Sequence, residues 1–317
     1  MSRRPGLVIS LLLLGLFSPV VAAEAIIRPD RDVQPGEARW TAQITEDFGA
    51  PYGRQSVCTG VLVKVRVVVT AAHCITDDSD FDSWLIRIGN RSSDPIDGET
   101  RRPLAIVYHG KYARTQSYDI LDEDGNLLES VEGVLNPGEN DLDSDIAIIY
   151  LDRAVHSVRP ARLPRSSGYQ PAPGWRTYGW GYTGESEESE PGTLLTAAQY
   201  DHTARSATEY KDPFHHLLSA VAVVDGLTSG TCWGDSGGPL IDGRGVLIGL
   251  TSASSAQFCS DPEPTLFTKM SSYLNWLPQA ERVARRAADV VRNGVRTGTP
   301  HSIPVLAYEQ MPIYPSH

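Results

Sequence analysis

Short apolar runs separated by turn-forming residues recur along the chain, and this alternation constrains the fold more than any other feature. In the run Val61–Val69, valines alternate with Lys64 and Arg66, which predicts a single strand with one face exposed to water. Further strands are predicted at Trp84–Ile88, Ile146–Leu151, Arg176–Trp180, Val221–Val224 and Val246–Leu250. Many short strands with little helix between them favour β-barrels or β-sandwiches over a doubly wound α/β sheet.

The composition fits a globular protein rich in turns. Of the 317 residues, 41% are hydrophobic, which is enough to bury a core, and the 28 glycines and 22 prolines suit many turns. The 39 acidic residues outnumber the 28 Lys and Arg and give a net charge of −11. A surface of this sign repels phosphate backbones, so we expect no nucleic acid among the partners.

The first 25 residues show the three parts of a secretory signal peptide. Arg3 and Arg4 precede the apolar run Val8–Phe17, and small residues follow in Val21–Ala25. A membrane anchor is the alternative, but the run is shorter than the roughly 20 residues that span a bilayer, and Pro19 interrupts its end. We therefore expect an exported protein, either secreted or periplasmic, with no membrane association once the signal is removed.

Two acidic stretches, residues 119–143 and 185–190, interrupt the strand pattern. The first is rich in carboxylates, whose oxygens calcium prefers, but it lacks the ligand spacing of an EF-hand loop. Solvated loops are the simpler interpretation of both stretches. We therefore expect no cofactor, with calcium bound at residues 119–143 as the alternative.

The C-terminal part is predicted to be helical and then irregular. Val283, Ala287, Val290 and Val291 fall on one face of a helix, and Gly294 is a natural place for that helix to end. Beyond it the chain is rich in proline and aperiodic, which fits either a packed strap or a flexible tail.

The residues that suggest chemistry begin with a serine flanked by glycines in Thr231–Leu240. Glycines allow a tight turn in which backbone N–H groups converge, and Ser236 in such a turn needs a base to act as a nucleophile. His73 follows the valine run directly and is the candidate base. Asp145 abuts an apolar strand, where a buried carboxylate can hold an imidazole; its rivals by composition are Asp141 and Asp143.

Three segments, in this order, resemble the chymotrypsin/trypsin-like serine proteases. They read V-V-V-T-A-A-H-C at Val67–Cys74, D-I-A-I-I at Asp145–Ile149 and C-W-G-D-S-G-G-P at Cys232–Pro239. The resemblance covers about Ile26–Leu277. It implies an all-β fold of two six-stranded antiparallel β-barrels with the active site between them, and a monomeric endopeptidase that acts on proteins or peptides.

The implied domain organisation has three parts. Residues 1–25 form the signal peptide, and residues 26–280 form the protease domain, with barrels at about 26–160 and 161–280. Residues 281–317 form a C-terminal helix and a proline-rich tail.

The resemblance also implies a role for each matching residue. Ser236 is the nucleophile, His73 is the general base and then the general acid, and Asp145 holds the imidazole and stabilises its charged form. The N–H groups of Gly234 and Ser236 form the oxyanion hole. Ser252 matches the serine that usually supports the aspartate.

The four cysteines fit an oxidising compartment, because their number is even and no C-x-x-C metal motif occurs. Spacing alone leaves the pairing open. The resemblance implies one disulfide between Cys58 and Cys74 and another between Cys232 and Cys259.

Substrate preference follows from the positions that match the specificity pocket. Gly230 stands where trypsin has an aspartate, so no carboxylate awaits a substrate Lys or Arg. Ser254 and Thr265 replace the wall glycines that admit large side chains, and Ser252 is a further residue assigned to the pocket. This elastase-like pattern predicts cleavage after small apolar residues such as Ala or Val.

Activation in the resembled family uses a newly cut N-terminal isoleucine, whose ammonium pairs with the aspartate before the nucleophile. Asp235 is that aspartate here, and Ile26 is the matching isoleucine directly after the A-x-A exit Ala23–Ala25. The sequence departs from the family where Arg28 and Pro29 replace the usual pair of glycines. We expect Ile26 to be exposed by export processing or by a short further trim.

Two other interpretations compete with an active protease. A catalytically inactive homologue that binds partners is one, although it usually lacks the serine or the histidine. An α/β-hydrolase esterase is the other, because Gly234–Gly238 contains its G-x-S-x-G motif. That class places its residues in the order Ser, acid, His, which this chain does not follow.

Overall fold

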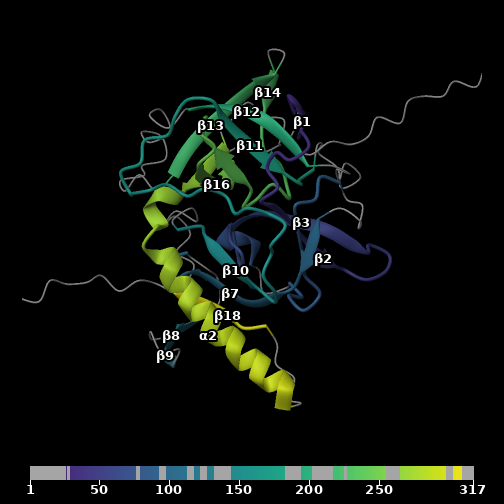
Figure 1. The fold of residues 1–317 in the computed structure, drawn as a ribbon, viewed down its shortest axis with the longest axis vertical. Coiled ribbons are helices and arrows are strands. Elements are labelled where there is room, and N and C mark those ends of the chain that lie inside the picture. Colours follow the sequence, from purple (N-terminus) through teal and green to yellow (C-terminus); the bar gives the residue numbers. More distant parts are fainter. Residues whose placement is uncertain are drawn as a thin grey trace, which may run out of the picture.

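The computed structural model describes residues 26, 29–75, 79–92, 98–112, 118–121, 127–131, 144–182, 194–201, 217–224, 227–254, 265–297 and 303–308. Within these residues the chain is mostly β-strand, arranged as two sheets with one long helix. Figure 1 shows the strands of the second sheet above those of the first, with the helix running along one side.

The first sheet contains seven consecutive antiparallel strands in the order β6-β5-β2-β3-β4-β10-β7. Their bounds are β2 (Thr41–Asp47), β3 (Arg54–Lys64), β4 (Val67–Thr70), β5 (Leu85–Ile88), β6 (Glu99–Arg101), β7 (Pro103–His109) and β10 (Ala147–Leu151). Only Arg102 separates β6 from β7, so the chain itself joins the two edges of this set. The pairing therefore runs round a ring of six strands, with β6 and β7 as two halves of one strand.

Three more strands extend this sheet beyond β7. The first is β18 (Val305–Tyr308), which pairs with β7 in the parallel direction. It is followed by β8 (Tyr118–Leu121) and β9 (Leu127–Val131), which form an antiparallel pair.

The second sheet closes on itself as six antiparallel strands. The order β12-β11-β15-β16-β17-β13 is completed by direct pairing of β12 with β13. Their bounds are β11 (Trp175–Gly179), β12 (Leu195–Asp201), β13 (Leu217–Val224), β15 (Pro239–Ile241), β16 (Leu247–Ser254) and β17 (Thr265–Lys269), with β1 (Arg31–Asp32) added to β12 and β14 (Leu227–Ser229) added to β13. The predicted fold class of two six-stranded antiparallel barrels is confirmed.

The prediction of one strand at Val61–Val69 is wrong. The segment contains the end of β3, a tight turn and β4, with Val61 opposite Val69 and Lys64 opposite Val67. The alternation of valines with charged residues is the same in a hairpin as in a single strand, because Lys64 and Arg66 flank the turn, where their charges reach water. Val65 at the turn is 44% exposed.

One helix, α2 (Trp276–Thr297), follows the second barrel and packs against β7 and β10 of the first. The short 3₁₀ turn η1 (Ala72–Cys74) follows β4. Another, η3 (Met270–Tyr273), lies between β17 and α2. The helix runs past Gly294, so the predicted stop is wrong, and Val290 lies exposed to solvent while Val283 and Val291 are buried.

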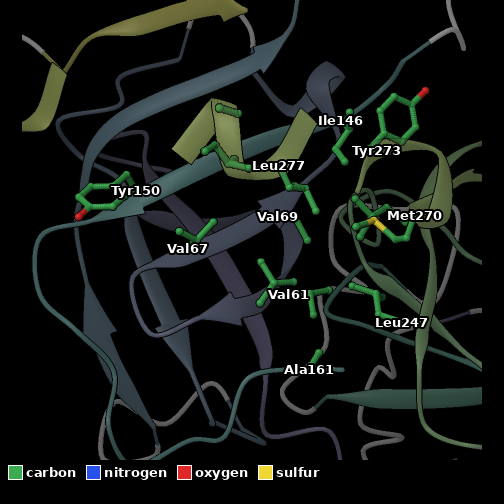
Figure 2. Close-up of a cluster of buried hydrophobic side chains, with 14 of the residues drawn as sticks. Val61, Val67, Val69, Ile146, Tyr150, Ala161, Leu247, Met270, Tyr273 and Leu277 are labelled. Atoms are coloured by element: carbon green, nitrogen blue, oxygen red, sulfur yellow. The ribbon is translucent and has the colours of Figure 1, made fainter. Parts of the chain in front are cut away.

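The largest hydrophobic cluster lies between the two barrels and the helix. Figure 2 shows Val61 and Val69 of the first barrel beside Leu247 and Met270 of the second, with Leu277 of α2 on the same cluster. A separate cluster fills the first barrel, and a smaller one lies in the second. This shared core fixes how the barrels meet, and the predicted site residues lie at that junction.

Several predictions fall on residues outside this description. They are the signal peptide, the acidic stretch at residues 185–190, most of the stretch at residues 119–143, and Cys259. Among the residues that are described, no helix combines the length and apolarity needed to cross a membrane.

Candidate functional site

His73 and Asp145 form a close pair at the junction of the barrels. His73 Nδ1 lies 2.8 Å from one carboxylate oxygen of Asp145, and the backbone N–H of His73 donates to the other oxygen at 2.9 Å. Asp145 is almost fully buried. Burial opposes a charged imidazolium, but the charge and hydrogen bond of Asp145 outweigh it, so the pKa of His73 is raised above its ordinary value.

The sequence places both residues just outside adjacent strands. β4 ends at Thr70 and leads through Ala71 into η1, which carries His73, while β10 begins two residues after Asp145. Because β4 and β10 are paired with Ala147 opposite Thr70, the histidine and the aspartate meet at one end of this pair. The carboxylate thus reaches both the ring and the backbone of His73.

Ser252 on β16 supports the aspartate from the second barrel. Its hydroxyl donates to the Asp145 oxygen that also faces the imidazole, at 2.5 Å, and the hydroxyl of Thr268 on β17 donates to the backbone carbonyl of Asp145 at 2.9 Å. The pair is therefore held from both barrels. A carboxylate that accepts several such bonds is fixed in orientation.

Ser236 lies in a turn that packs against the strands carrying His73. The backbone carbonyl of Ser236 accepts a hydrogen bond from the Thr59 amide at 2.9 Å. Gly237, at φ +75°, is so close to the first barrel that a Cβ on it would lie 2.1 Å from Thr70 Oγ1. Only glycine fits there, which explains the glycine directly after the serine.

Gly234 also makes a close approach in this turn. It has φ +89°, and a Cβ on it would lie 2.9 Å from the Cα of Gly181. Among the described residues, the amides of Cys232, Asp235, Gly237 and Gly238 are used in hydrogen bonds within or beside this turn, whereas those of Gly234 and Ser236 are not. Two backbone N–H donors, on residues separated only by Asp235, are therefore available to a ligand.

Asp235 is buried, and its hydrogen bonds to other described residues all come from backbone amides. The amide of Gly181 donates to Oδ1 at 2.8 Å and the amide of Cys232 donates to Oδ2 at 2.9 Å. Burial dominates over these two bonds and raises the pKa of Asp235 to about 7. The predicted partner Ile26 is fully buried, at φ +64°, a strained conformation for a β-branched residue.

The predicted pocket residues converge on neighbouring strands. Ser254 on β16 is opposite Thr265 on β17, and Thr265 is buried with its hydroxyl 3.1 Å from that of Thr231, next to Gly230. Ser252 lies two residues before Ser254 on β16. The structure therefore brings Gly230, Thr265 and Ser254 into one region beside the Ser236 turn.

The disulfide between Cys58 and Cys74 is present, with an S–S distance of 1.98 Å. It joins β3 to η1 and so anchors the turn that carries His73. Cys232 is also disulfide-bonded, while Cys259 lies outside the described residues.

The described residues contain no group of three or more His, Cys, Asp or Glu side chains that would hold a metal ion. The acidic residues 122–126 lie outside that description, so calcium at residues 119–143 stays an untested prediction.

Sequence reasoning missed three residues that shape the site. Thr59 donates to the Gly234 carbonyl at 2.8 Å, Tyr273 donates to the Ser144 hydroxyl at 3.4 Å, and Thr268 holds the Asp145 carbonyl. Thr59 and Thr268 lie within the stretch Ile26–Leu277 that the resemblance covers, but outside the three segments that carry it. Tyr273 lies beyond those segments, and no pattern pointed to it.

Comparisons with known proteins agree on one family. The sequence model described as Trypsin matches residues 27–277. Serine protease 57 of mouse is 27% identical over 69% of this chain and 70% of its own length, and kallikrein-8 of rat is 28% identical over 84% and 91%. Among solved structures, neuropsin, a serine protease of mouse brain, is 25% identical with a TM-score of 0.58, covering 79% of this chain and 98% of its own.

Proposed function

Because the chain belongs to the trypsin family and is a serine endopeptidase, we propose that it cleaves peptide bonds through Ser236, His73 and Asp145. The observation that carries this proposal is the bonded series Ser252–Asp145–His73, assembled from both barrels beside the Ser236 turn. A histidine held by a buried carboxylate on one side has its other ring nitrogen available to a hydroxyl.

In the proposed reaction, Asp145 keeps the Nδ1 proton of His73 directed toward itself, so Nε2 is the basic nitrogen. Nε2 takes the proton of the Ser236 hydroxyl as the oxygen attacks the substrate carbonyl, and the negative oxygen that forms accepts hydrogen bonds from the Gly234 and Ser236 amides. His73 returns the proton to the departing amine, which leaves an ester on Ser236. Water, activated by the same nitrogen, hydrolyses that ester and restores Ser236.

The preferred cleavage site in this proposal follows small apolar residues. Gly230 offers no carboxylate to a basic side chain, and buried Thr265 has a β-branched side chain fixed against Thr231. Digestion of a peptide library with purified protein tests this. Predominant cleavage after Ala or Val supports the specificity, and predominant cleavage after Lys or Arg contradicts it.

The proposal includes export and activation at the N-terminus. Ile26 is already buried, and Asp235 is a buried carboxylate without a cation among the described residues. Cutting the bond before Ile26 creates an ammonium group that can pair with the buried Asp235 carboxylate. N-terminal sequencing of secreted, active protein tests the assignment, and a fully active form that begins before Ile26 contradicts it.

An organophosphonate probe tests the nucleophile itself. The unchanged protein is expected to react at one serine, identified by mass spectrometry as Ser236, and Ser236→Ala is expected to lower turnover on the order of 10⁶-fold. Ser167→Ala, which removes an exposed serine hydroxyl that the mechanism does not use, is the matched control and keeps its labelling. If the unchanged protein is not labelled, the chain acts as the inactive binding homologue.

A further inference from the structure

The C-terminal strand β18 lies in sequence beyond the part of the chain that the family matches, yet it is built into the first barrel. It pairs with β7 over Val305–Tyr308, and its side chains alternate between two cores. Val305 and Ala307 pack with the cluster inside the first barrel, while Leu306 and Tyr308 pack with the cluster under α2. A strand that contributes to both clusters is an integral part of the packing.

On its other edge β18 pairs with part of the segment between His109 and Ser144, which is called the insertion below. The chain leaves β7 at His109, forms the strands β8 and β9, and returns at Ser144. Among the described strands, β8 pairs with β9 and with β18, where Ala307 is opposite Ile120, and neither β8 nor β9 pairs with a strand of the barrel ring. The ladder that connects the insertion to the barrel therefore passes through β18.

Both ends of the insertion meet beside the catalytic aspartate. The amide of His109, the last residue before the insertion, donates to the carbonyl of Ile146 at 3.0 Å. Ser144, the residue before Asp145, has φ +62°, a conformation that is unfavourable for serine and needs support. The hydroxyl of Tyr273 reaches the Ser144 hydroxyl at 3.4 Å.

Tyr308 of β18 is bonded to the residues that form this support. Its carbonyl accepts from Trp276 Nε1 at 2.8 Å and from the Gly110 amide at 3.0 Å. Its hydroxyl donates to Gln279 Oε1 of α2 at 2.6 Å. The ring of His109 lies 5.5 Å from that of Tyr273 and 5.3 Å from that of Trp276, between centroids. A continuous set of contacts thus runs from β18 to Ser144.

We propose that β18 is a positioning element for Asp145: by pairing with β8 and bonding to Trp276 it fixes the insertion and the backbone of Ser144 and Asp145, so that full activity requires the docked C-terminus. This proposal rests on the proposed function, since it gives Asp145 its catalytic role. It acts through Asp145 and not on substrate.

The structural half of the proposal is tested by hydrogen exchange on the full-length protein. Ala307 is 1% exposed, so Ala307→Asp introduces a charge where β18 meets β7 and β8. We expect at least a tenfold loss of amide protection in residues 118–121 and 127–131, while residues 239–241 of the second barrel stay protected. Leu306→Ile, half-buried on the same strand and equal in volume, is the matched control and keeps protection everywhere.

The catalytic half is tested by kinetics on the same variants. Loss of a fixed Asp145 is expected to lower kcat by ten- to a hundredfold with little change in KM, because misplacement by about 1 Å has effects of that order. The acidic limb of the rate-against-pH profile moves to lower pH, because Asp145 is what raises the pKa of His73. A purely structural strand would leave that limb where it is.

Rescue in trans completes the test. A synthetic peptide with the sequence of Ile303–Tyr308, added to Ala307→Asp protein, is expected to restore activity, whereas the same peptide with Asp at its fifth position does not. Retained protection of residues 118–131, or an unchanged kcat and pH limb when that protection is lost, overturns the proposal.

If Ala307→Asp also lowers amide protection in residues 239–241 of the second barrel, Tyr308→Ala is measured instead. It removes the Tyr308 ring from the cluster under α2 and the hydrogen bond to Gln279, which weakens the docking of β18 without introducing a charge, and the same outcomes apply. Failure of the proposed function is distinguishable, because the unchanged protein then shows no phosphonate labelling, whereas failure of the positioning role leaves labelling equal in all variants.

Discussion

Two buried aspartates near the junction of the barrels differ in how their charge is balanced. Asp145 faces an imidazole, a serine hydroxyl and a backbone amide, whereas Asp235 accepts from two backbone amides and faces no cation among the described residues. Both side chains are about equally buried. Two carboxylates that are equally buried therefore differ in the partners that stabilise them.

This difference fits the two roles in the proposed function, catalysis for Asp145 and activation for Asp235. The surroundings of Asp145 are complete within the folded chain, so the histidine is oriented as soon as the barrels meet. Asp235 faces no cation in the described part of the chain, and in the proposed activation a cation is created by cutting a peptide bond. In the proposed function, Asp145 acts in every catalytic cycle, whereas Asp235 acts once, during activation.

The largest effect is expected from neutralising Asp145. Asp145→Asn keeps the size of the side chain but presents an amide to His73, which favours the wrong tautomer, so kcat is expected to fall about 10⁴-fold. Steady-state kinetics on a peptide substrate measures this, with circular dichroism to show that the fold is kept. A fall of less than tenfold would remove Asp145 from the mechanism.

A smaller effect, on the free energy of unfolding, is expected from the titration of Asp235. Its pH dependence is expected to differ between the uncut chain and the chain cut before Ile26. In the uncut chain its pKa of about 7 exceeds the ordinary 3.8. Between these values the folded state binds more protons than the unfolded state, so the free energy of unfolding falls as pH rises from about 4 to about 7, by at most about 1.4 kcal/mol per pH unit.

Cutting before Ile26 is expected to remove this fall. An ammonium beside Asp235 lowers the pKa of its carboxyl, and stability is then lost only as pH drops through the lowered value. Denaturation with urea at a series of pH values, on the uncut Ser236→Ala chain and on the same variant cut before Ile26, measures both slopes. Asp235→Asn in the uncut chain is the control and is expected to lack the fall. Equal slopes in the two forms would separate Ile26 from Asp235.

The sequence was sufficient for the parts of the site that are local in the chain. Apolar strands next to His73 and Asp145 located both residues at strand ends, and the adjacency of Asp145 to its strand distinguished it from Asp141 and Asp143. Contacts between distant segments were invisible to such reasoning. The hairpin within Val61–Val69 has the same alternation as one strand, and the docking of Val305–Tyr308 depends on an open edge of β7 that no local pattern reveals.

The smallest effect is expected at Glu37, a carboxylate that already has its cation. Arg31 binds both oxygens of Glu37 at 2.8 Å, and Tyr178 donates to it as well. The hydrogen bonds from Arg31, against the opposing effect of burial, lower the pKa of Glu37 to about 2. This cluster fixes the chain between Ile26 and the first barrel, because Arg31 belongs to β1, which pairs with β12.

Glu37→Gln is expected to destabilise the protein at pH 7 by about 1 kcal/mol, because the pair is partly exposed and screened by solvent. The contribution is fully present above the ordinary pKa of 4.5 and is lost as pH falls through about 2. The two proteins should therefore differ in urea denaturation at pH 7 and converge in acid. The control is Glu281→Gln, which breaks an exposed ion pair between Glu281 of α2 and Lys64 of β3 and is expected to change stability less. A difference between Glu37→Gln and the unchanged protein that persists below pH 2 would mean that packing around Tyr178, and not the charge of Glu37, holds this segment in place.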